Sequence, residues 1–283
     1  MKISPQFSEK IAFMLLFVST WLVILPVGFI VFIIVKNGWH AVNWEFLTTM
    51  PKMGMREGGI FPAIVGTLYL VLGTLIFAIP LGILAAVYLT EYARDNVLNR
   101  LVKLAIINLA GVPSVVYGLF GLGIFVLFLK FGASILAGSL TLAIMVLPII
   151  ITTSKESLES VPQSFRDVSL SLGVTKWQTI RYAVLPYALP GMLTGIILAI
   201  GRTAGETAPI LFTVAAFYLP KLPTSIFDQA MALPYHLYVM STQVPNVKVE
   251  TRYGTALVLL GLVLFMNLVA IVVRSHFRKK KKW

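Results

Sequence analysis

Long apolar runs alternate with shorter polar stretches along this chain, and the runs are long enough to cross a lipid bilayer. A helix needs about 20 mostly apolar residues to span the hydrocarbon core. Prolines interrupt several runs, which membrane helices tolerate because neighbouring groups satisfy the freed carbonyls. The pattern predicts an all-α membrane protein with one transmembrane domain, 1–283, whose six helices cover approximately 11–35, 60–90, 104–129, 134–154, 187–218 and 255–274.

Composition agrees with this pattern and excludes several functions. Of the 283 residues 58% are hydrophobic and 12% are charged, whereas a soluble domain has about 45–50% and about 25%. The absence of cysteine excludes disulfides, thiol catalysis and cysteine-bound metals. The first run lacks a small-residue cleavage site, which favours a retained span over a signal peptide. The net charge of +12 does not indicate nucleic-acid binding, because a basic cluster directly follows the last apolar run, at Arg274, Arg278 and Lys279 to Lys282.

The distribution of basic residues predicts the orientation. Cytoplasmic loops of membrane proteins carry an excess of Lys and Arg. With both termini in the cytoplasm, most of the 23 basic residues fall on the cytoplasmic side. The polar loop 155–186 is then cytoplasmic and the loop 219–254 external. The external loop contains "SIFDQAMALPYHLYVM", which is typical either of short interfacial helices that face a partner or of a lid without one.

The cytoplasmic loop reads as two short helices joined at a glycine. Pro162 suits the start of the first helix, and Gly173 ends it because glycine adopts the left-handed conformation. A second helix from about Thr175 runs into Leu185 and Pro186 at the membrane entry. Such a hairpin suits insertion into a cleft of a cytosolic protein, whose movement it would transmit. An amphipathic loop that lies on the bilayer surface is the alternative.

The loop resembles the EAA motif of binding-protein-dependent ABC importers. That motif is EAA, three residues, Gly, nine residues and I-x-L-P. This chain has Asp167-Val168-Ser169, then Gly173, then Ala183-Val184-Leu185-Pro186 at the same spacing, with Asp for Glu, Val and Ser for the alanines, and Ala for Ile. The resemblance implies docking on an ATP-hydrolysing subunit, with ATPase-coupling residues Arg166, Asp167, Ser169, Gly173, Leu185 and Pro186.

No nucleotide or catalytic motif occurs in the chain. It lacks GxxxxGK[ST], so the cradle that holds ATP phosphates is missing. It also lacks HExxH, and His40, His236 and His276 lie near or outside the span ends. We therefore expect no enzyme, no bound cofactor and no metal, with ATP and Mg used by a partner ATPase.

Arg202 and Glu206 stand four residues apart in an otherwise apolar run, "GRTAGETAP". This spacing places both on one face of a helix. A charge at mid-membrane costs about 2.5–3.5 kcal/mol and usually faces the bundle interior or a water path. Two interpretations remain open. The residues pair and fix packing, or they line the path of a polar solute, with the Arg202 fork suited to oxyanions and Glu206 holding the gate.

Small residues occur at close-packing spacings in two spans. Gly201 and Gly205, and Gly191 and Gly195, form GxxxG pairs, which permit close approach within the subunit or between subunits. The segment "GVPSVVYGLFGLG", 111–123, contains Pro113, which predicts a kink. Ser114 and Tyr117 in this segment present hydroxyls either to a solute or to packing partners.

Together these segments resemble the permease subunits of the phosphate importer known as the Pst system. The likeness runs from "GGIFPAIVGTLYLV" at Gly58 to the last span, and "GETAPILFT" is more similar to the PstA type than to the PstC type. The resemblance implies a type I ABC-importer (MetI-like) permease fold in the inner membrane and import of inorganic phosphate by alternating access. It also implies as partners a PstC-like permease, two PstB-like ATPase copies and a PstS-like external binding protein.

Three alternatives remain. A permease of the same fold for sulfate, molybdate or an amino acid would carry the same loop motif, because the motif contacts the ATPase and not the solute. An ion-coupled secondary transporter should show two related halves, and no internal repeat is evident. An intramembrane enzyme lacks the residues noted above.

Overall fold

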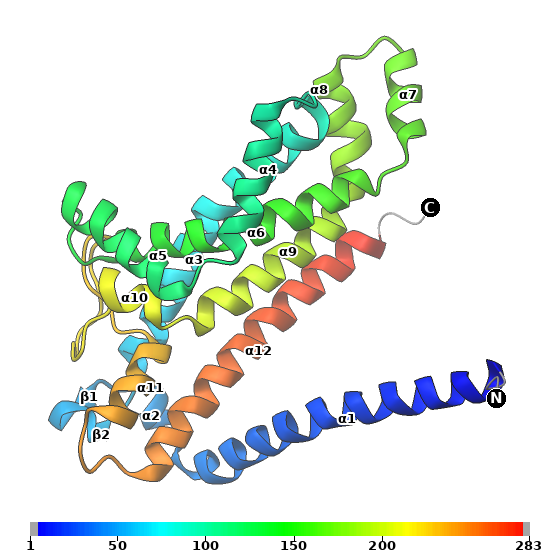
Figure 1. Cartoon of the computed structure of the whole chain (residues 1–283). Helices are drawn as coiled ribbons and strands as arrows, with labels where there is room; N and C mark the ends of the chain where they lie inside the picture. The colour runs from blue at the N-terminus through cyan, green and yellow to red at the C-terminus, as the bar shows by residue number, and fades with distance from the viewer. Residues whose placement is uncertain (1–4, 280–283) are drawn as a thin grey trace.

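The computed structural model describes residues 5–279 and shows an elongated bundle of helices (Figure 1). The basic cluster predicted at Lys280 to Lys282 lies outside the described residues. Five helices are long, namely α1 (Pro5–Gly38), α3 (Phe61–Val87), α6 (Ile135–Glu159), α9 (Leu185–Gly205) and α12 (Val249–Lys279). The shorter elements are α2 (Trp44–Thr48), β1 (Pro51–Lys52), β2 (Glu57–Gly58), α4 (Val97–Ala110), α5 (Ser114–Gly121), α7 (Gln163–Ser171), α8 (Lys176–Gln178), α10 (Ala208–Thr213) and α11 (Leu233–Thr242).

Five of these helices are long and apolar enough to cross a membrane, and a bent pair completes six among the described residues. The pair consists of α4 and α5, the latter continuing as a π-helical segment to Phe128, and its axes differ by 106°. The predicted helix over 104–129 is therefore not continuous but divided, at the place where Pro113 predicted a kink. Pro113 lacks the N–H that would continue α4, and Tyr117 Oη donates 2.7 Å to the carbonyl of Leu109 across the bend.

The helices α3, α6 and α9 form the centre of the bundle, where small residues let their backbones approach. A Cβ on Gly195 would lie 2.8 Å from Thr153 Cβ, and one on Gly191 would lie 2.9 Å from Ser157 Cβ. Helix α6 also contacts α3, where Ile150 of α6 packs against Gly82 of α3. The second GxxxG pair of the sequence thus packs within the subunit, as small residues in membrane helices do.

Helix α1 runs apart from the bundle and meets it only near its C-terminal end (Figure 1). Every described side chain from 9 to 32 is exposed. Gly38 at its end packs on the backbone of Tyr253, at the start of α12. An all-apolar helix surface of this kind requires lipid or another apolar protein surface around it.

Several predicted boundaries differ from the structure. Helices α1 and α12 are both longer than predicted, and α12 begins at Val249, six residues inside the predicted loop 219–254. Helix α6 continues to Glu159, five residues into the predicted loop 155–186. The predicted helix over 187–218 ends at Gly205, because Glu206 is extended (φ −74°, ψ 134°), and the short α10 follows. Gly205 and Pro209 both disfavour a continuous helix across this segment.

The predicted external loop folds back on the bundle. Its short helix α11 is anchored by Leu233, whose N–H donates 2.8 Å to Thr67 Oγ1 on α3. Leu233 and Met240 are buried. The two-stranded ribbon pairs Pro51 with Gly58, and Tyr218 Oη of the external loop donates 3.1 Å to the carbonyl of Pro51.

His236 on α11 is expected to make folding stability depend on pH. It is buried, its Nδ1 has no hydrogen-bond partner within the described chain, and burial lowers its pKa from 6.5 to about 4. The unfolded chain therefore takes up the proton first as the pH falls. Stability is complete above pH 6.5 and declines toward pH 4, by at most about 3 kcal/mol. Thermal melting of the purified protein between pH 7 and 4 measures this; His236→Phe should flatten the curve, and an equal decline in that variant would contradict the assignment.

Candidate functional site

The charged pair lies at the place where α9 ends. Arg202 belongs to its last turn and Glu206 is the first residue beyond it, so the two do not share one helix as predicted. They still meet, because Arg202 Nε donates 3.2 Å to Glu206 Oε1. The Arg202 side chain is 33% exposed and that of Glu206 17%. Arg202 stands about 26 Å along the axis from Leu185, at about 1.5 Å per residue, which places it deep within the bundle's length.

The guanidinium of Arg202 is only partly used. Within residues 5–279 it forms one hydrogen bond, through Nε, and its two terminal nitrogens have no protein acceptor. A cation near a helix C-terminus is favoured by the helix dipole, whereas the Glu206 carboxylate is not. The arrangement leaves a fork of donors free, next to a carboxylate that neutralises its charge.

Helix α5 approaches this break from the other side. A Cβ on Gly118 would lie 3.0 Å from Pro209 Cα. The next contact along α5 joins Gly121 to Thr213, so α5 and α10 run parallel. Ser114 is half-buried and lies four residues before Gly118, on the same face of α5.

The hydroxyl of Tyr117 donates to the carbonyl of Leu109, as described above. The ring instead lines an apolar cavity of about 280 Å³ between α4, α5 and α6. Tyr117 therefore stabilises the bend, whereas the Ser114 hydroxyl forms no hydrogen bond among the described residues.

The glycines beside the pair face different surroundings. A Cβ on Gly201 would lie 3.3 Å from Asn267 Nδ2 on α12, and one on Gly205 would have nothing within 4 Å. Asn267 Oδ1 and Thr203 Oγ1 are buried and have no hydrogen-bond partner in the part of the chain that the structure describes. Neither Asn267 nor Thr203 stood out in the sequence, because isolated polar residues in apolar spans are common.

A second group of predicted residues forms the α7–α8 hairpin, residues 163–184. Gly173 has a φ of +79°, the left-handed conformation predicted for it. Thr175 then starts α8 with a capping box to Gln178. A π-helical turn, Thr179–Val184, leads directly into Leu185 and Pro186 at the start of α9. The hairpin and the charged pair are thus joined by one continuous helical element.

The hairpin exposes an apolar surface. The exposed fractions are 64% for Val168, 79% for Leu172 and 69% for Tyr182. Asp167 is exposed as well and accepts from Gln163 Nε2 at 3.2 Å. Ser169 points inward, because its hydroxyl lies 3.0 Å from that of Thr179. This surface has the character of a docking site, with a charge beside apolar side chains.

Arg166 points away from that surface, because its guanidinium bonds to residues at the ends of α3 and α6. Its Nε donates to the Glu91 carboxylate at 3.1 Å, its Nη2 donates to the same carboxylate at 2.6 Å, and the side chains are 12% and 7% exposed. Nη1 donates 2.8 Å to Val161 O and Nη2 donates 2.9 Å to Leu158 O. The sequence did not single out Glu91, because it stands close to Arg94 and Asp95 after an apolar run and resembles any other charged residue of a polar loop.

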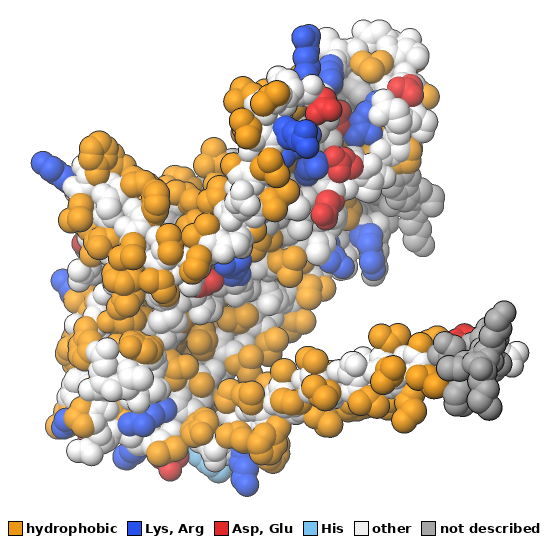
Figure 2. Space-filling model, viewed as in Figure 1, with side chains coloured by type: hydrophobic (Ala, Val, Ile, Leu, Met, Phe, Trp, Pro, Cys, Tyr) orange, Lys and Arg blue, Asp and Glu red, His pale blue; other side chains and the backbone are white. Residues whose placement is uncertain are grey.

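Charged side chains gather at the two ends of the molecule in the view of Figure 2, over the hairpin and near the ribbon β1–β2. Hydrophobic side chains cover the length between them and α1. No cluster of three or more His, Cys, Asp or Glu occurs among residues 5–279. The molecule thus combines an apolar belt, a half-buried arginine fork and an exposed hairpin.

Comparison with known proteins agrees with this architecture. The family "Binding-protein-dependent transport system inner membrane component" matches residues 78–283. The chain is 33% identical over 282 residues to "Phosphate transport system permease protein PstA 1" of Mycobacterium tuberculosis H37Rv, covering 98% of this chain and 91% of the relative. It is 34% identical over 278 residues to "Phosphate transport system permease protein PstA" of Yersinia pestis, covering 94% and 87%. It is 33% identical to "Probable ABC transporter permease protein YqgI" of Bacillus subtilis, covering 90% of each.

Solved structures show the same fold at low identity. A chain of a bacterial ABC transporter that imports alginate matches with a TM-score of 0.66 and 15% identity, covering 98% of this chain and 97% of that one. A chain of the inward-facing MetNI methionine ABC transporter matches with a TM-score of 0.58 and 15% identity, covering 77% and 94%. The predicted type I importer permease fold is confirmed.

A permease of this kind works with an ATP-hydrolysing subunit and a binding protein and is not itself an enzyme. Its similarity to the phosphate permeases extends over nearly the whole chain. The protein belongs to the family of binding-protein-dependent transport system inner membrane components, as a multi-pass permease subunit of an ABC importer.

Proposed function

We propose that this chain is the PstA-like permease of an ATP-driven importer that moves inorganic phosphate into the cytoplasm. The observation that carries the proposal is the arginine fork of Arg202, whose terminal nitrogens have no acceptor among the described residues although the side chain is only 33% exposed. A planar guanidinium binds tetrahedral oxyanions through paired hydrogen bonds. The names of the relatives, PstA over almost the full chain, support phosphate as that oxyanion.

Alternating access follows from the continuity between hairpin and pair. ATP-driven movement of the docked hairpin displaces the start of α9, and α9 carries Arg202 at its other end. Ser114 on α5 and Arg202 on α9 then line opposite sides of the phosphate path. In the absence of phosphate, Glu206 neutralises Arg202, which keeps the arginine from trapping an anion permanently.

The assembly proposed from the same features contains a PstC-like second permease, two PstB-like ATPase copies and a PstS-like external binding protein. The bare apolar surface of α1 packs on lipid and on the second permease. Because Arg274 Nη1 donates 3.0 Å to Thr194 Oγ1, α12 runs antiparallel to α9 and ends at the hairpin side. Helix α1 starts on that side too, since its end packs at the start of α12. Both termini are therefore cytoplasmic.

Glu206→Gln is expected to slow phosphate uptake by about tenfold at saturating phosphate. The substitution removes the charge that competes with phosphate for Arg202, so that the anion is released more slowly; a hydrogen bond to a charged group contributes about 1.5–3 kcal/mol. Uptake and phosphate retention are measured in proteoliposomes that contain the whole complex. Unchanged uptake with an unchanged dependence on phosphate concentration would show that Glu206 has no gating role.

ATP hydrolysis by the reconstituted complex tests the substrate. A phosphate importer should hydrolyse ATP faster when its binding protein is loaded with phosphate than when the protein is empty, and a sulfate-loaded preparation should resemble the empty one. Equal stimulation by sulfate would assign the chain to a different solute of the same fold.

A further inference from the structure

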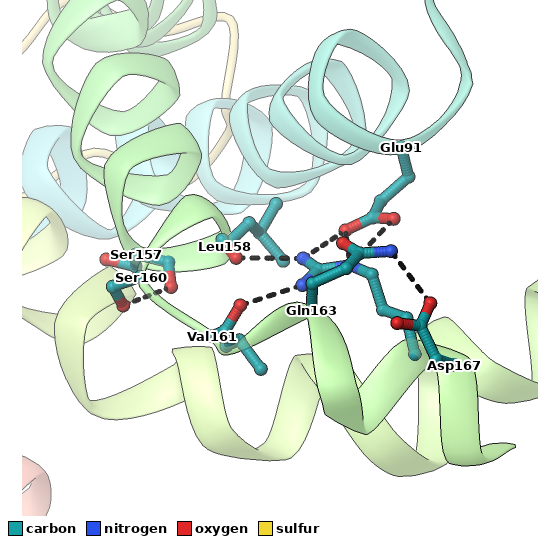
Figure 3. Close-up of polar contacts among 8 residues, drawn as sticks. Glu91, Ser157, Leu158, Ser160, Val161, Gln163 and Asp167 are labelled. Atoms are coloured by element: carbon teal, nitrogen blue, oxygen red, sulfur yellow. Dashed lines mark hydrogen bonds and ion pairs between the residues drawn. The ribbon is translucent and has the colours of Figure 1, made fainter.

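The Arg166–Glu91 ion pair joins three segments that are far apart in the sequence. Arg166 lies on α7, Glu91 lies in the π-helical turn Tyr88–Tyr92 that ends α3, and the carbonyls of Leu158 and Val161 lie at the end of α6. One guanidinium therefore bridges α7 to the ends of both α3 and α6 (Figure 3). An arginine can do this because its five N–H donors have a fixed planar geometry.

The hairpin's other contacts with the ends of α3 and α6 are not ion pairs. Ile180 and Val184 pack in the same buried apolar cluster as Leu89 and Leu158, and Lys176 Nζ lies 5.1 Å from the centre of the Tyr92 ring. A cavity of about 540 Å³ lies beside the ion pair, lined by Thr90, Glu91, Glu159, Gln163, Arg166 and Lys176 among others.

Elsewhere on α7, the Ser169 hydroxyl lies 3.0 Å from that of Thr179. The Phe165 ring packs against Tyr187 and against the buried cluster that includes Leu158 and Val161. Within the described residues, the Arg166–Glu91 pair is the one hydrogen-bonded link between α7 and the end of α3.

The pair is also sheltered enough to be mechanically significant. Exposed ion pairs contribute little to stability, because water and salt screen them. Removing one partner of a buried pair is far more costly, because the other charge stays buried without compensation. At 12% and 7% exposure, Arg166 and Glu91 belong to the second group. The Lys155–Glu159 pair on α6, at 33% and 52% exposure, belongs to the first and provides a matched control.

We infer that the Arg166–Glu91 pair is a brace that makes α3 and α6 move with the coupling hairpin, so that Arg166 is a positioning residue inside the permease and not a contact to the ATPase. The exposed face of the hairpin, at Val168 and Leu172, is left to the ATPase. Movement of the docked hairpin then reaches the bundle along two routes, directly into α9 and through the brace into α3 and α6. The inference depends on the proposed function in one respect: phosphate is the solute whose transport measures the coupling.

Glu91→Gln tests the brace in the complete complex reconstituted with its binding protein. The expected result is about a tenfold fall in phosphate moved per ATP hydrolysed, with ATP hydrolysis itself reduced much less, because the docking face is intact. Glu91→Asp, which keeps the charge, should recover a large part of the coupling, and Lys155→Gln should behave as wild type. Two results for Glu91→Gln would overturn the inference. One is a fall in ATP hydrolysis as large as the fall in transport, and the other is a change in coupling no larger than that of Lys155→Gln. Complex yield and melting temperature identify a variant that merely fails to fold.

A distance measurement tests the brace without any transported solute. The chain has no cysteine, so spin labels can be placed at Ser171→Cys on α7 and Leu84→Cys on α3. Electron paramagnetic resonance should give one narrow distance that stays the same when ATP is trapped in the complex. In the Glu91→Gln background the distribution should widen or shift on trapping. A wild-type distance that changes on trapping would show that α7 moves independently of α3, whatever the solute proves to be.

Discussion

Arg202→Lys is expected to lower phosphate uptake by about 10- to 100-fold while the complex still assembles. Lysine keeps the positive charge but loses the planar fork, so that one or two charge-assisted hydrogen bonds to phosphate disappear, each contributing about 1.5–3 kcal/mol. Because the terminal nitrogens of Arg202 have no protein acceptor in the described chain, few internal contacts are lost. Uptake of labelled phosphate by proteoliposomes measures the effect.

The control for this variant is the ATP hydrolysis that remains without binding protein, which Arg202→Lys should leave near the wild-type rate. Wild-type uptake by the lysine variant would remove the fork from the proposal and leave Arg202 as a packing residue paired with Glu206. A fall in complex yield, by contrast, would assign the residue to structure.

Gly195→Val is expected to destabilise the subunit by about 3 kcal/mol or more, with loss of assembled complex from the membrane. The new Cβ would overlap Thr153, whose Cβ lies 2.8 Å away, and both residues belong to the centres of packed helices. Overpacking of this kind typically costs about 1–3 kcal/mol even where the structure relaxes, and here two backbones would have to separate.

Gly261→Val on α12 is the matched control, because a Cβ there meets nothing within 4 Å. Melting temperature in detergent and the yield of complex should both be near wild type for this variant. If the two valine variants behaved alike, the close approach of α6 and α9 through Gly191 and Gly195 would not be a source of stability.

The parts of the fold that are encoded locally were predictable from the sequence. Apolar length alone indicates a span, since a bilayer requires about 20 apolar residues whatever the neighbours are. Gly173 could be identified as the turn of the hairpin because its backbone conformation is one that glycine adopts readily, and its φ of +79° confirms it. Pro113 predicted the interruption of the third span for the same kind of local reason.

Features that depend on distant contacts were not predictable. The 106° angle between α4 and α5 is set by packing and by the bond from Tyr117 to Leu109, and not by Pro113 alone. The partner of Arg166 is 75 residues away, and no spacing rule relates it to Glu91. Helical spacing correctly brought Arg202 and Glu206 together, although α9 ends between them, because an i, i+4 pair can still meet one residue beyond a helix end.

The central claim is that this permease admits phosphate past Arg202 when a partner hydrolyses ATP. Accumulation of labelled phosphate against labelled sulfate by proteoliposomes containing the complete complex, with ATP present or absent, measures it most directly. We predict phosphate accumulation that requires ATP and the binding protein, with sulfate neither accumulated nor able to compete. Sulfate uptake equal to that of phosphate, or phosphate uptake that is independent of ATP, would contradict the claim.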